Sequence, residues 1–103
     1  MAQVATGQRT AALDLAARID RELDYQLQAW RGIPERETWW SEMDAADKEA
    51  FQLEWTGITE SRLHDLETWA GSGNLTPSQN ARYAKLRALI ADQRPALDRL
   101  FAS

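Results

Sequence analysis

The stretch from residue 51 to residue 69 carries the pattern that most constrains what this chain can fold into. Large apolar side chains recur along it at helical spacing, so that they share one side of a helix turning about 100° per residue. These residues are Phe51, Trp55, Ile58, Leu66 and Trp69. A helix with so wide an apolar side has to be covered by other elements. Because the pattern keeps its phase across Gly57, it predicts a continuous or slightly kinked helix that runs to about Ala70. Ser41 or Asp44 can cap this helix, and we expect Asp44 to do so.

A further helix is indicated before this one, followed by a short helix that leads into it. From residue 10 to residue 30 the apolar residues form one stripe, and we expect Gly32 to end that helix in the left-handed conformation. Pro34 forbids continuation and can open a short helix that carries Trp39 and Trp40.

The last helix has the clearest start in the sequence. Thr76, Pro77 and Gln79 form the capping-box arrangement. The apolar stripe stays in phase beyond Pro95, where we expect a kink or a brief break followed by a terminal turn on the same side. The chain is therefore predicted to be all-α, a small helical bundle of three long amphipathic helices plus one short helix. Residues 1–9 are expected to be a flexible N-terminus and residues 10–103 a single helical bundle domain.

The 103 residues carry a net charge of −4 that is unevenly distributed. Residues 35–67 hold ten acidic and three basic residues, whereas the segment from residue 77 onward is basic. Either these segments face each other within one bundle, or the acidic middle binds a basic partner, or the basic end contacts phosphate. The ten arginines against two lysines, with abundant alanine, are typical of a GC-rich genome and indicate a bacterial or phage origin.

Residues with catalytic or metal-binding chemistry are scarce. The chain has no cysteine and one histidine, His64, so thiolate chemistry is excluded and a serine triad would depend on that single imidazole. Glu60, His64 and Glu67 share a helical side, but di-iron helical proteins need a glutamate and histidine pair on each of two helices. We therefore predict no enzyme activity, no catalytic residues, no metal site and no cofactor.

Nucleic acid and membranes are not indicated as partners. The overall acidity opposes contact with a polyanion. The sequence has no apolar run of the roughly 18 residues that a membrane span needs, and its start lacks a signal pattern, so we expect a soluble, cytoplasmic protein.

Tryptophan is unusually abundant, with five in 103 residues. A helical core explains Trp30, Trp55 and Trp69. Two adjacent rings on a short helix diverge by about 100°, so one core cannot easily bury both Trp39 and Trp40. We therefore expect one of that pair at a contact surface.

An interaction function follows from these residues, because tryptophan and arginine dominate the energetics of protein interfaces. We predict a non-enzymatic protein–protein interaction module, a small regulator or accessory subunit, whose partner is another protein or a second copy in a homo-oligomer. The predicted partner-binding residues are Trp39, Trp40, Arg36, Leu53 and Arg62. The alternatives are a small apolar-ligand carrier whose rings line a cavity, or an acidic inhibitor that mimics nucleic acid.

Overall fold

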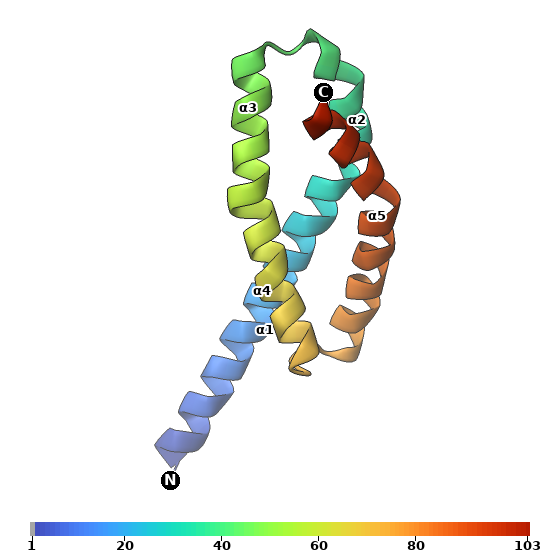
Figure 1. Cartoon of the computed structure of the whole chain (residues 1–103). Helices are drawn as coiled ribbons and strands as arrows, with labels where there is room; N and C mark the ends of the chain where they lie inside the picture. Colours follow the sequence, from blue (N-terminus) through green and yellow to red (C-terminus); the bar gives the residue numbers. More distant parts are fainter. Residues whose placement is uncertain (1) are drawn as a thin grey trace.

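The computed structural model describes residues 2–103, with the surroundings of the side chains described from residue 11 onward. Apart from short turns this part of the chain is helical and contains no strand, which confirms the all-α prediction (Figure 1). The elements in chain order are α1 (Ala2–Arg31), α2 (Ile33–Trp39), the 3-10 turn η1 (Trp40–Glu42), α3 (Ala45–Glu54), the π-helical turn η2 (Trp55–Thr59), α4 (Glu60–Gly71) and α5 (Pro77–Ala102). Because α3, η2 and α4 follow one another without interruption, the chain forms three long helices and the short α2.

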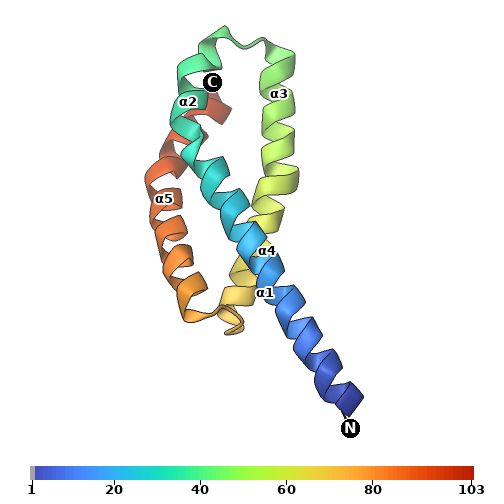
Figure 2. The same cartoon turned by 180° about the vertical axis from the view of Figure 1, so that it is seen from behind.

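Helix α1 contacts both α4 and α5, and the opposite views in Figures 1 and 2 show that it crosses α4 while α5 lies to one side. Its first turns extend well beyond the other helices (Figure 1). The molecule is therefore elongated, with a longest axis of 60 Å and a Cα radius of gyration of 17.0 Å, whereas a compact domain of this length has about 13 Å. The end of α5 reaches α2 on the opposite side of the molecule from this extension.

The core lies where α1 meets α4 and α5. Its fully buried apolar side chains are Ile19, Leu23, Trp30, Ile33, Leu66, Leu86 and Leu97. Trp30 and Trp55 meet edge to face with ring centres 4.9 Å apart, a geometry that aromatic pairs favour. The buried amide of Gln26 links the helices, because it accepts from Trp30 Nε1 at 3.1 Å and donates to the Thr59 carbonyl oxygen at 3.0 Å.

The turn η2 changes which residues of the central helix face the core. Its wider turn holds more residues than an α-helical one and shifts the apolar side of the helix. Thr59 is therefore buried and Ile58 is 43% exposed. The prediction that Ile58 shares the buried side is wrong, because it assumes a regular α-helix. Gly57 lies inside this turn and does not end the helix, so the predicted continuity is confirmed.

The ends of the helices follow local sequence signals with one exception. Asp44 caps α3 with its side chain, and Thr76 and Gln79 form the capping box of α5, as predicted. Gly32, by contrast, is right-handed with a φ of −78°. The expected left-handed ending is wrong, because α2 follows α1 directly and the Arg36 N–H donates to the Gly32 carbonyl at 3.0 Å.

Two further expectations concern the outer helices. Helix α5 continues through Pro95 and bends toward α2 (Figure 1), and Leu97 and Leu100 are buried beyond the proline, so the apolar stripe does stay in phase. Helix α1 begins at Ala2 instead of Thr10. The flexibility expected for residues 1–9 stays a prediction, and residue 1 lies outside the described residues. Along residues 2–103, no helix is both long enough and apolar enough to cross a membrane.

Candidate protein-binding groove between α2 and α3

An open groove separates α2 from α3. None of residues 45–54, which form α3, is buried, although the sequence predicts that the side of the helix carrying Phe51 is covered. The groove has a volume of about 680 Å³. It is lined by Gly32, Glu35, Arg36, Trp39, Met43, Asp47, Ala50, Phe51 and Glu54. The fold therefore covers this face of α3 only in part.

The two adjacent tryptophans take different positions beside the groove. Trp39 lines it and is 54% exposed. Trp40 is 6% exposed, and its ring packs against Phe51 and Phe101 with ring centres 5.7 and 6.4 Å apart. Its indole N–H donates to the Ser103 hydroxyl at 3.0 Å. Because neighbouring helical residues diverge by about 100°, only one ring of the pair is exposed. Trp40 is buried within the fold, and its predicted role in partner binding stays a prediction.

Arg36 lies over the aromatic floor of the groove. Its guanidinium carbon is 4.4 Å from the centre of the Phe51 ring, which is a favourable cation–π distance. Among the side chains of residues 11–103, Arg36 forms no ion pair with a carboxylate. The guanidinium group therefore contacts the ring of Phe51 without a carboxylate partner among these residues.

Three carboxylates line the same groove. They belong to Glu35, Asp47 and Glu54, and with the one positive charge of Arg36 they give the lining a net charge of −2. None of the three forms an ion pair with a side chain in residues 11–103. The groove is thus an acidic surface whose charge the described part of the fold leaves unbalanced.

Other acids of the same segment are paired with α5. Glu60 accepts from Arg94 at 2.9 Å, and Glu37 lies 3.6 Å from Arg99. The acidic middle of the chain and its basic end therefore face each other in part. The carboxylates of the groove lie outside that arrangement.

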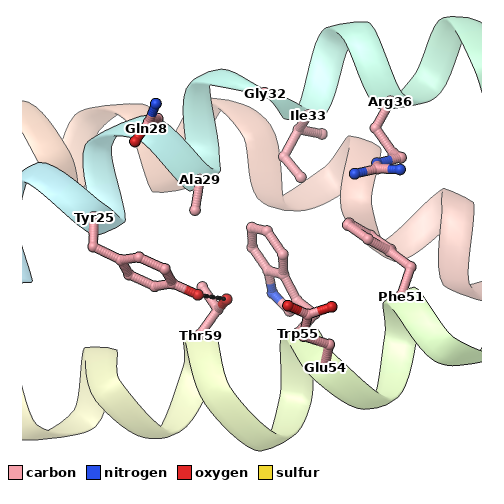
Figure 3. A pocket seen from close by; sticks show the side chains of 10 residues that line it. All are labelled: Tyr25, Gln28, Ala29, Gly32, Ile33, Arg36, Phe51, Glu54, Trp55 and Thr59. Atoms are coloured by element: carbon pink, nitrogen blue, oxygen red, sulfur yellow. Dashed lines mark hydrogen bonds between the residues drawn. The ribbon is translucent and has the colours of Figure 1, made fainter.

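A deeper pocket opens from the groove where α1 meets α2. Its volume is about 250 Å³. The residues common to the pocket and the groove are Gly32, Arg36, Phe51 and Glu54. Figure 3 shows Ala29 and Ile33 on the α1–α2 side of the pocket, facing Trp55 on the opposite helix. Apolar walls of the pocket therefore come from the consecutive helices α1 and α2 on one side and from η2, more than twenty residues further along the chain, on the other.

The far end of this pocket is polar. The hydroxyl oxygens of Tyr25 and Thr59 are 2.9 Å apart and share a hydrogen bond (Figure 3). Arg62 stacks on the Tyr25 ring, with its guanidinium carbon 3.9 Å from the ring centre, and its Nε donates to Glu22 Oε1 at 2.8 Å. Arg62 is thus held within the fold, where it supports the pocket.

The structure brings together two of the five residues predicted to bind a partner, Arg36 and Trp39. Leu53 is 64% exposed but lines neither the groove nor the pocket. Sequence reasoning missed Gly32 and Thr59. Gly32 contributes to the site because it has no side chain that would fill the space. Thr59 reaches the pocket only because of the π-helical turn. No local sequence signal therefore marks either residue.

The side chains of residues 11–103 include no group of three histidine, cysteine, aspartate or glutamate residues that could hold a metal ion. Glu60 is engaged within the fold, because it also accepts from Trp55 Nε1 at 3.1 Å. His64, on the same helix, is exposed. The residues that the sequence singles out for metal binding therefore do not converge on one point.

No protein-family model matches the chain, and searches of curated proteins and of solved structures found no match either. The function therefore has to be inferred from the geometry of the groove.

Proposed function

We propose that this protein is a non-enzymatic interaction module, a small regulator or accessory subunit, that binds a basic amphipathic segment of a partner protein between α2 and α3. The observation that carries the proposal is the exposed ring of Trp39 beside three carboxylates that form no ion pair within residues 11–103. The ring receives the apolar side of the segment, and the carboxylates receive its lysines or arginines.

The apolar part of the groove suits a short helix. Trp39, Met43, Ala50 and Phe51 line it, and a large aromatic ring at the centre of an interface often contributes more than other contacts. Helix α3 has 10 residues, so its length of about 15 Å matches a bound segment of roughly three helical turns. Such helix-in-groove binding is a recurring mode of peptide recognition.

The charge of the groove selects the kind of partner. A basic segment complements Glu35, Asp47 and Glu54, and this complementarity speeds association and discourages acidic competitors. A second copy that paired groove to groove would bring two surfaces of net charge −2 together. The homo-oligomer predicted from the sequence remains a prediction. Because two such grooves would repel each other, a second copy would have to bind through another surface.

The two alternative functions have weaker support. Pockets for drug-sized ligands have volumes of about 300–1,000 Å³, whereas the deeper pocket has about 250 Å³. The groove is larger, about 680 Å³, but an apolar ligand there would lie against three carboxylates. An acidic mimic of nucleic acid would need exposed carboxylates, and Glu37 and Glu60 are already paired with arginines.

Peptide display against the intact protein tests the proposal. The library would contain random peptides long enough for about four helical turns, and the selected peptides would be synthesised and titrated by calorimetry. We expect a consensus in which lysines or arginines flank an apolar stripe. Trp39→Ala should weaken binding by at least about thirtyfold, whereas Leu13→Ala, which removes an exposed apolar side chain from α1, should leave the affinity unchanged.

The indole N–H signals of the five tryptophans provide an internal control in NMR titrations. The signal of Trp39 should shift when a selected peptide is added, whereas that of Trp69, which lines neither cavity, should stay in place. An acidic consensus, or peptides that bind the Trp39→Ala variant as tightly as the unmodified protein, would refute the proposal.

A further inference from the structure

The deeper pocket has the size and lining of a slot for one aromatic ring. Its volume is about 250 Å³, and a cavity of about 150 Å³ already holds a benzene ring. Ala29 and Ile33 lie on one side of the space, and Trp55 and Phe51 lie on the other (Figure 3). These side chains offer apolar contact on two sides of the space, which is also lined by the polar side chains of Gln28, Arg36 and Glu54.

The entrance of the slot lies on the groove. Gly32 and Glu54 line both cavities, so a segment bound in the groove passes directly over the opening. A Cβ atom at Gly32 would meet only main-chain oxygens of its own helix, at 3.5 and 3.6 Å, which are ordinary contact distances. Glycine is therefore not required by the backbone here, because any residue can adopt the φ of −78°. Its lack of a side chain leaves the entrance of the slot open.

The far end of the slot can accept a hydrogen bond. Tyr25 and Thr59 share one hydrogen bond between their hydroxyl groups. Each hydroxyl oxygen has two lone pairs that can accept, so the pair keeps unused acceptor capacity. An N–H or O–H group at the tip of an inserted ring would have a partner there, whereas a ring without a polar tip would leave the capacity unused.

We propose that the bound partner segment inserts one tryptophan or tyrosine side chain into this pocket, with its N–H or O–H donating to the hydroxyl pair of Tyr25 and Thr59. This inference rests on the proposed function and names the side chain by which the groove recognises its segment. The basic residues of the segment contact the carboxylates at the rim, and the inserted ring sets the register of the segment in the groove.

The test uses the peptides selected by display against the intact protein. We expect the consensus to contain one tryptophan or tyrosine among its basic residues. Replacing that anchor by alanine should weaken binding more than about tenfold. Replacing it by phenylalanine should cause a smaller, severalfold loss, because only the net contribution of one neutral hydrogen bond is removed.

Removal of the two hydroxyls separates the hydrogen bond from the shape of the pocket. The double variant Tyr25→Phe with Thr59→Val keeps the ring and the branched side chain. It should bind the phenylalanine-anchored peptide as the unmodified protein does and should lose its preference for the tryptophan- or tyrosine-anchored one. A merely structural disturbance would weaken both peptides equally, and that outcome would overturn the hydrogen-bonding part of the proposal.

Closing the entrance tests the insertion itself. Gly32→Leu places a side chain at the opening and should weaken the anchored peptide more than about tenfold. The matched control is Gly71→Leu, at a position with open space and an ordinary φ at the end of α4, which should leave binding unchanged. Circular dichroism and thermal unfolding of both variants verify that each is folded.

The outcomes distinguish the two proposals. If Trp39→Ala weakens the selected peptides but Gly32→Leu does not, the groove binds the segment and the insertion of a ring is wrong. If the peptides carry no aromatic anchor, the insertion is likewise wrong. If no basic peptide binds, both proposals fail. With insertion, the indole signal of Trp55 shifts together with that of Trp39, and an unmoved Trp55 signal would contradict it.

Discussion

Helices α3 and α4 are two halves of one continuous helix, yet their side chains are buried to different extents. Helix α4 lies against α1 and buries Leu63 and Leu66, whereas α3 buries none of its side chains. Both halves carry large apolar residues at helical spacing. An amphipathic pattern therefore identifies a face that can be covered, but not whether the cover comes from the same chain.

The physical reason for the difference lies at the joint and in the facing wall. The π-helical turn η2 shifts the apolar side of the helix, so that Thr59 takes a buried position between the two halves. Opposite α3, the α1–α2 junction presents Ala29 and Gly32, which are too small to fill the space. Opposite α4, core side chains of α1 and α5 cover Leu63 and Leu66, although pockets of about 240 and 560 Å³ remain along the outer side of the α4–α5 contact.

The largest expected effect is a contrast in stability between the two halves. Leu66→Ala removes a side chain with 0% exposure and should lower the free energy of unfolding by about 2–5 kcal/mol, because it leaves a cavity in the core. Leu53→Ala, on the exposed face of α3, should change it by no more than about 0.5 kcal/mol. Urea denaturation of the two variants measures both values, and equal losses would show that α3 is covered as well as α4 is.

A smaller effect is expected at the joint between the halves. Gly57 has open space around its Cα and no positive φ, so Gly57→Ala should raise the free energy of unfolding by about 0.5–1 kcal/mol through better helix propensity. Gly73→Ala serves as the control, because Gly73 has a φ of 73° and the substitution should destabilise the loop. Destabilisation by Gly57→Ala in the same urea assay would indicate that the central helix breaks there.

The smallest expected effect concerns the contact between α4 and α5 at alkaline pH. Burial raises the pKa of Tyr83 above its usual value, and the nearby charge of Glu67 raises it further, while Arg87 opposes the shift. The folded protein therefore holds the phenol proton to higher pH than the unfolded chain does. The stability gained from this is complete below a pH of about 10 and is lost as the pH rises through the raised pKa.

Tyr83→Phe removes this titration, so the free energy of unfolding of the variant should fall less steeply as the pH rises above about 10. Urea midpoints measured on either side of a pH of about 10 for the variant and the unmodified protein provide the test. A decline of the same steepness in both proteins would mean that Tyr83 is not the group responsible, and that its contact with α4 is looser than the structure shows.

Local chemistry allowed much of the helical framework to be predicted. The cap at Asp44, the capping box at Thr76 and the phase of the stripe beyond Pro95 all depend on residues within a few positions of one another. The candidate site was less predictable. Arg36 and Trp39 were recognised by residue type, but their partnership with Phe51 across the groove is a contact between two helices, which neither segment encodes alone.

The sequence by itself determined that the chain is helical, where most helices begin and end, and that one of two adjacent tryptophans must leave the core. Only the tertiary structure decided that the exposed ring is Trp39, that Thr59 replaces Ile58 on the buried side, and which carboxylates form no ion pair among the side chains of residues 11–103. Helix signals act between residues a few positions apart, so they can be read along the chain. Burial, pairing of charges and the shape of a pocket depend on how helices distant in sequence meet, and that is settled only when they pack.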